Sequence, residues 1–195
     1  MLIAEPERAT KYLDKLLEKK IEWYESLFAQ TGGCIDMIAE YDDLGTQRGP
    51  WISKELFHKF ILPRHKELWA EVKRMSPDVK IFLHTCGSVS SLLGDLIDAG
   101  LDCLNPIQIN ADNMDPYYLK REFGKHLTFW GGGVDTQIIL PTGTPQQVAD
   151  NVKRNIDALA PGGGYVFASV HNVQDDVPPE NFMAMLEAFR ENCNY

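Results

Sequence analysis

The stretch VKIFLHTCG at residues 79–87 decides the fold of this chain. Its first residues are mostly apolar and typical of a strand, and a helical pattern then extends from Ser88 to Ala99 and stops at Gly100. Strand, loop and helix in this order are the repeating unit of a parallel α/β sheet. His84 and Cys86 lie two residues apart at the strand end, so both side chains project to one side and could bind one metal ion.

The same unit recurs along the 195 residues, with no linker or low-complexity segment between units. We expect helices at residues 6–30, 53–72 with a break at Pro63, 88–99, 116–123, from Pro145 onward, and 178–191. We expect strands at residues 34–39, 80–84, 102–105, 127–130 and 165–169. Strands that alternate with helices predict one domain built on a parallel sheet with right-handed crossovers.

This pattern alone leaves two architectures open. Both an open doubly wound sheet and part of a (β/α)8 barrel use this order, and a complete barrel takes about 250 residues. The motif Gly-x-Gly-x-x-Gly is missing after the first expected strand, which argues against a dinucleotide-binding sheet. In either architecture the active site forms where the strands end.

Composition excludes some classes of function. The formal net charge of −9 and the pI near 5.0 disfavour nucleic acid or an anionic membrane surface as partner. No apolar run approaches the roughly 18 residues of a membrane span, and no leader pattern is visible, so we expect a cytoplasmic protein. The four cysteines, Cys34, Cys86, Cys103 and Cys193, lack short paired spacings and are expected to be free thiols.

A metal site is the first candidate for chemistry. Thiolate and imidazole are ordinary zinc ligands, and a catalytic zinc site leaves one position open. His171, two residues beyond the last expected strand, is the best third ligand to join His84 and Cys86, because all strand ends of a parallel sheet meet at one edge. The alternative is a hydrogen-bonded histidine beside a buried thiol.

Acidic residues follow the first expected strand. Glu40, Asp42 and Asp43 could ligate metal, accept a substrate proton or hold a cationic group. The alternative is a turn that caps a helix, because Asp-Asp-Leu-Gly is also ordinary loop chemistry.

Further polar residues follow the other strands or lie in the loops between them. Any one of them could simply stabilise a turn, but their shared place at strand ends predicts that some line a polar pocket. The candidates for substrate binding, with Glu40 and Asp42, are Gln47, Ser53, Asn105, Gln108, Asp135 and Gln137. Ser53 is also a good helix N-cap.

Taken together, these residues resemble the uroporphyrinogen decarboxylase superfamily, which includes zinc methyltransferases that work with corrinoid proteins. The resemblance extends over nearly the whole chain in order. It rests on Ser53-x-x-x-Phe57-x-x-Phe60-x-x-Pro63, His84-Thr85-Cys86-Gly87, Asn105-Pro106-Ile107-Gln108, Phe129-Trp130-Gly131-Gly132-Gly133-Val134-Asp135, Gly143-Thr144-Pro145 and Pro178-Pro179-Glu180-Asn181.

The resemblance implies a (β/α)8 barrel, of which residues 1–195 look like the C-terminal five strands as a single domain, with the N-terminal strands missing. Such a partial barrel has open edges, so we expect a truncated gene product or an assembly, either a homo-oligomer or a complex with a complementing chain.

The resemblance also implies an activity. The leading interpretation is a methyltransferase that moves a methyl group between a corrinoid protein and a small-molecule thiol. Zinc would be held by His84, Cys86 and His171, with Glu40 or Asp43 as a fourth ligand, and the catalytic residues would be Asp43, His84 and His171. One alternative is a metal-free decarboxylase of a tetrapyrrole, as in porphyrin biosynthesis, with Asp43, Ser53 and His171 on the substrate. Another is an inactive fragment or binding subunit.

Overall fold

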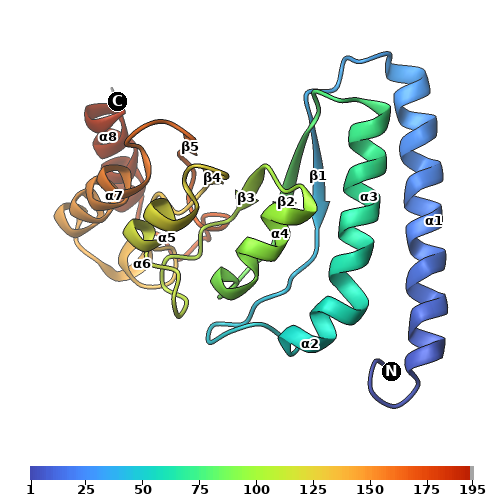
Figure 1. Ribbon diagram of the computed structural model, residues 1–195. Helices are drawn as coiled ribbons and strands as arrows, with labels where there is room; N and C mark the ends of the chain where they lie inside the picture. The colour runs from blue at the N-terminus through green and yellow to red at the C-terminus, as the bar shows by residue number, and fades with distance from the viewer. Residues whose placement is uncertain (194–195) are drawn as a thin grey trace.

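The computed structural model describes residues 1–193 and has alternating strands and helices in chain order (Figure 1). The strands are β1 (Met37–Tyr41), β2 (Lys80–His84), β3 (Cys103–Asn105), β4 (Thr128–Trp130) and β5 (Tyr165–Val166). The helices are α1 (Pro6–Thr31), α2 (Lys54–Leu56), the π-helix η1 (Phe57–Ile61), α3 (Leu62–Met75), the 3-10 helix η2 (Ser90–Leu92), α4 (Leu93–Ala99), α5 (Pro116–Phe123), α6 (Ile139–Thr142), α7 (Pro145–Leu159) and α8 (Pro179–Asn192).

The five strands form one parallel sheet in the order β1-β2-β3-β4-β5. Strands that follow one another in sequence order, joined by crossovers of one hand, place all of their helices on the same face of the sheet. The five-stranded α/β prediction is therefore confirmed, in the form of a partial barrel rather than a doubly wound sheet, which would carry helices on both faces.

Alternation along the strands divides the side chains between two faces. The outer face, which the helices cover, is fully buried and carries Ile38, Glu40, Ile81, Leu83, Leu104, Phe129 and Tyr165. The inner face carries Met37, Ala39, Tyr41, Lys80, Phe82, His84, Cys103, Asn105, Thr128, Trp130 and Val166, of which Cys103 alone is buried. The hydrophobic core thus lies between the sheet and its helices.

Local chemistry explains how several helices begin. Thr144 caps α7 with a complete capping box, in which its hydroxyl accepts from the Gln147 N–H. Asp115 and Ser53 cap α5 and α2 in the same way, each accepting a backbone N–H three residues later. A break was expected at Pro63, but the helical run continues from Lys54 to Met75, and next to this proline it changes only in type, from η1 to α3.

Several predicted boundaries were wrong. The first strand was placed at residues 34–39 but runs over Met37–Tyr41, because Gly32 and Gly33 at positive φ and the following turn take up the earlier residues. The last strand ends at Val166 rather than at 169, and α6 lies between residue 130 and Pro145, where no helix was expected. The third predicted helix, 88–99, is a 3-10 turn followed by the short α4.

In the described residues 1–193, every helix is too short or too polar to cross a bilayer.

Candidate metal centre

Three strand ends supply the ionisable side chains of the candidate site. His84 is the last residue of β2 and Cys86 follows it, while Asp43 follows β1 and His171 follows β5. Asp43, His84 and Cys86 each offer a ligand atom, and these atoms lie within 4.8 Å of one another. Because parallel strands end at one edge, residues far apart in sequence meet here.

Asn105 fixes the orientation of His84. The Asn105 amide nitrogen donates to the Trp130 carbonyl at 3.0 Å, so its Oδ1 faces His84 Nδ1 at 2.6 Å. The Nδ1–H of His84 therefore donates to this oxygen, which leaves Nε2 with a free lone pair. A partner of this kind on the second ring nitrogen is the usual support of a metal-binding histidine.

The Cys86 sulfur lies between two imidazole rings. Its Sγ is 3.5 Å from His84 Nε2 and 3.6 Å from His171 Nε2. Ligand bonds of about 2.0–2.3 Å in a tetrahedral zinc site place the donor atoms roughly 3.5 Å apart. Both distances from the Cys86 sulfur therefore fit zinc, while the group of donors that all lie within 4.8 Å of one another contains Asp43, His84 and Cys86 but not His171.

Asp43 brings a carboxylate to the same cluster. Its Oδ1 accepts the Cys86 N–H at 2.9 Å, and this bond, with smaller effects of His84 and His171, lowers the Asp43 pKa. Burial first, and the adjacent Asp43 second, raise the pKa of Cys86 to about 12. The thiol by itself is therefore protonated at neutral pH, and a bound metal ion would be needed to hold it as thiolate.

The environment of His171 favours its neutral form. Partial desolvation, followed by the nearby His84, lowers the pKa of His171, while Asp43 acts in the opposite direction. The two rings are 6.4 Å apart between centroids. Neutral imidazole is the form that binds metal.

A network of amide side chains lies beside the ionisable cluster. Gln108 Oε1 accepts the Gly87 N–H at 2.8 Å, and Gln108 Nε2 donates to Gln47 Oε1 at 2.8 Å. Gln47 donates in turn to the Asn110 carbonyl at 2.5 Å. Both glutamines were predicted to bind substrate, and the structure places them together, with their amides engaged in protein contacts.

Asp135 and Gln137 form the next part of this network. Asp135 Oδ1 accepts the backbone N–H groups of Gln137 and Ile138 at 2.8 and 3.1 Å. The Asn110 amide donates to Asp135 at 3.3 Å and to the Gln137 side chain at 2.7 Å. Asp135 thus stabilises its own loop, which was the alternative interpretation of this residue.

Three predicted site residues lie elsewhere. Glu40 is within β1 rather than after it, and it is buried on the outer face, where Tyr24 donates to it at 2.6 Å and Lys20 forms an ion pair. Burial, with Glu40 adding to it, raises the Tyr24 pKa. Asp42 points to His65 of α3, at 3.1 Å from its Nε2. The Ser53 hydroxyl caps α2.

Sequence reasoning missed three residues near the site. Tyr41 lies beside His84 with 5.4 Å between ring centroids, and Asn110 connects the two halves of the amide network. His65 stacks on Trp69 and contacts Asp42. Tyr41 could have been found by carrying the first strand two residues further, because register then sets it opposite His84.

Comparisons with known proteins identify the family to which the chain is similar. The model of the family described as uroporphyrinogen decarboxylase (URO-D) matches residues 1–192. A methylated-thiol–coenzyme M methyltransferase of Methanosarcina mazei is 27% identical over 187 residues, which are 96% of this chain and 46% of that protein. A uroporphyrinogen decarboxylase of Chlorobaculum parvum is 23% identical over 194 residues, 98% of this chain and 51% of that protein.

A solved structure has the same fold. A methyltransferase from Methanosarcina mazei superposes with a TM-score of 0.70 at 22% identity, covering 97% of this chain and 51% of that chain. The present chain therefore spans about half the length of the curated relatives it matches.

Proposed function

Because the chain belongs to the uroporphyrinogen decarboxylase family, we propose that it is a zinc-dependent methyltransferase that moves a methyl group between a corrinoid protein and a small-molecule thiol. The observation that carries the proposal is a cluster at the strand ends in which ligand atoms of Asp43, His84 and Cys86 lie within 4.8 Å of one another, with His171 Nε2 3.6 Å from the Cys86 sulfur. The methylated-thiol–coenzyme M methyltransferase named above supports the same reaction class.

His84, Cys86 and His171 would hold the metal, and Asp43 would occupy the fourth position until a substrate thiol replaces it. Zinc lowers the pKa of a bound thiol and keeps it as the nucleophilic thiolate. Asn105 holds His84 so that Nε2 faces the centre, and the Cys86 N–H fixes one oxygen of Asp43. These contacts preorganise the donors before the metal arrives.

Access to the site suits a large methyl carrier. Asp43 and His171 are exposed, so the centre opens at the carboxyl end of the sheet. We therefore include a corrinoid protein among the proposed partners, and a second copy or a complementing chain that covers the open edges of the sheet. The reaction is proposed for the cytoplasm, where thiols stay reduced.

A methyl-transfer assay tests the proposal. Zinc-loaded protein is mixed with methylcobalamin and 2-mercaptoethanesulfonate, and loss of the methyl–cobalt bond is followed by the corrin absorption spectrum. We expect turnover that Cys86→Ala abolishes and that a His126→Ala change, at an exposed histidine far from the cluster in sequence, leaves intact. Zinc binding without turnover on any thiol would contradict the methyltransferase assignment.

Tetrapyrrole decarboxylation is the second candidate, because uroporphyrinogen decarboxylases align over 98% of the chain. In that reaction Asp43 and His171 would contact the substrate, while Ser53 is already used as a helix cap. Carboxylate loss from uroporphyrinogen I by metal-free protein would favour it. A folded protein that binds a corrinoid or a tetrapyrrole without turning it over would instead be a binding subunit.

A further inference from the structure

Asp42 lies at the junction between β1 and the candidate metal centre. It follows Tyr41, the last residue of β1, and precedes Asp43. Its N–H donates to the His84 carbonyl at 3.0 Å, so the pairing of β1 with β2 extends one residue beyond the strand. The Asp42 backbone is therefore bonded to the backbone of one proposed zinc donor and joined covalently to another.

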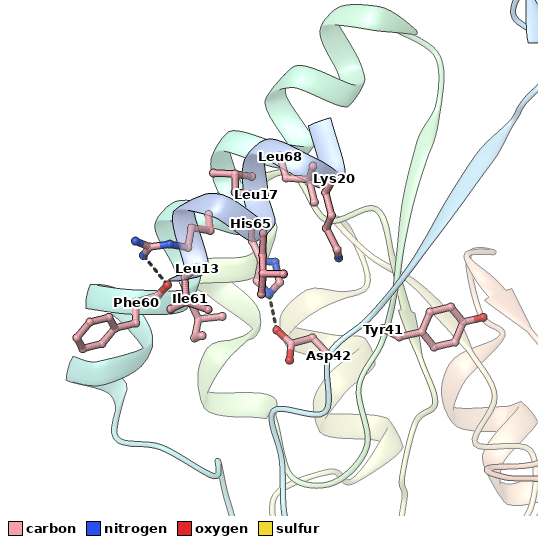
Figure 2. A pocket seen from close by; sticks show the side chains of 11 residues that line it. Leu13, Leu17, Lys20, Tyr41, Asp42, Phe60, Ile61, His65 and Leu68 are labelled. Atoms are coloured by element: carbon pink, nitrogen blue, oxygen red, sulfur yellow. Dashed lines mark hydrogen bonds and ion pairs between the residues drawn. The ribbon is translucent and has the colours of Figure 1, made fainter. Parts of the chain in front are cut away.

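Side chains along this part of the chain alternate between the two faces of the sheet. Glu40 is buried on the outer face, and Asp42 continues the even-numbered series toward the helices. Figure 2 shows Asp42 and Tyr41 pointing to opposite sides of the chain. Asp43 belongs to the odd-numbered series, and its Oδ1 accepts the Cys86 N–H at 2.9 Å. An Asp42 side chain that is held against the helices thus directs Asp43 to the metal centre.

His65 of α3 is the group that meets Asp42 on the outer side. Its Nε2 lies 3.1 Å from Asp42 Oδ2, beside a cavity of about 280 Å³ between α1, α3 and the end of β1 (Figure 2). His65 is 8% exposed, and its ring stacks on the fully buried Trp69 with 4.8 Å between centroids. Because this packing fixes the imidazole, Asp42 is anchored to the packed layer of helices.

Two other cationic side chains line the same cavity, and both are bonded elsewhere. Lys20 forms an ion pair with Glu40, and Arg64 forms one with Asp14. Both of these pairs connect α1 to another element, whereas the Asp42 contact connects the end of β1 to α3. The Asp42 carboxylate is therefore left to the imidazole of His65.

We propose that His65 is a positioning residue of the metal centre, acting through Asp42 on the Asp43 carboxylate. The inference rests on the proposed function, in which Asp43 occupies the fourth zinc position. Contacts that orient a metal ligand from outside typically change metal affinity by about 10- to 100-fold. Without His65 the Asp42 side chain loses its anchor, the segment can turn, and the Asp43 carboxylate leaves the Cys86 N–H even before a metal is bound.

Hydrogen exchange of the zinc-free chain, followed by NMR, tests this link directly. In His65→Leu, which keeps an apolar side chain in the packed layer, the Cys86 amide should exchange about tenfold faster, because its acceptor is no longer held. The Ile81 amide, which donates to Asp102 Oδ2 at 2.8 Å on the same strand as His84, should keep its rate. His65→Gln returns an N–H donor near the place of Nε2 and should restore most of the protection.

His58 supplies the matched control. Its Nε2 lies 3.0 Å from Asp95 Oδ2, a second pair of imidazole and carboxylate, which joins η1 to α4 rather than to the end of β1. His58→Leu should leave the Cys86 exchange rate unchanged. Faster exchange at Cys86 and Ile81 alike, or at Cys86 in both histidine variants, would overturn the proposal, as would an unchanged Cys86 rate in His65→Leu.

A zinc titration extends the test to the metal. His65→Leu should raise the zinc dissociation constant about tenfold in the wild-type background. In an Asp43→Ala background it should raise it less than about twofold, because the ligand on which it acts is then absent. Equal factors in both backgrounds would overturn the proposal. If the wild-type chain binds no zinc, the proposed function fails, while the exchange rates still decide whether His65 positions Asp43.

Discussion

The carboxyl end of the sheet has two halves that differ in how their polar atoms are used. Beside β1, β2 and β5, the donors of His84, Cys86, Asp43 and His171 converge with lone pairs still available. Beside β3 and β4, carboxamides and Asp135 bond mainly to one another and to the backbone. We propose that the first half takes a ligand, whereas the contacts of the second half hold the loops around it.

The largest expected effect is in the ionisable half. His84→Ala removes an imidazole donor and the anchor for Asn105, and we expect the zinc dissociation constant to rise more than about 100-fold, beyond the usual effect of an outer-sphere change. Competition with a chromophoric chelator measures it. His126→Ala is the matched control, and an equal change in both variants would remove His84 from the site.

A smaller effect is expected where the two halves meet. Asn105→Ala deletes the acceptor that orients His84, which should weaken zinc binding about 10- to 100-fold. Asn105→Asp keeps an acceptor for Nδ1–H and should restore part of the affinity. If alanine and aspartate behave alike, the orienting role of Asn105 is wrong.

The polar half should respond in stability rather than in metal affinity. Asp135→Ala leaves the Gln137 and Ile138 N–H groups without their acceptor, which should lower the free energy of unfolding by about 1–3 kcal/mol. Urea unfolding measures this loss. A large fall in zinc affinity with unchanged stability would place Asp135 in the site instead of the scaffold.

The smallest effect separates two cysteines that have no part in the centre. Burial, and then Asp102, raise the pKa of Cys103 to about 12, whereas Cys34 is exposed. At pH 8, iodoacetamide should alkylate Cys34 readily and Cys103 only after unfolding, as mass spectrometry of digests would show. Equal labelling of both cysteines in the folded chain would mean that solvent reaches the Cys103 thiol without unfolding.

The sequence predicted the parallel sheet and the strand ends that meet, because hydrophobic periodicity and chain order determine both. It misplaced Glu40, since a strand boundary wrong by two residues moved this carboxylate from the outer face to the strand end. It also could not assign Gln108 or Asp135 to scaffolding, because their partners Gln47 and Asn110 come from loops whose paths depend on tertiary packing.

Zinc stoichiometry is the most direct test of the metal centre. Elemental analysis of wild-type protein and of Cys86→Ala, after zinc incubation and desalting, needs no substrate and no partner. We predict about one zinc ion per wild-type chain and none in the variant, whose fold is checked by circular dichroism. A folded wild-type chain that retains no zinc, or a variant that keeps the full amount, would contradict the account.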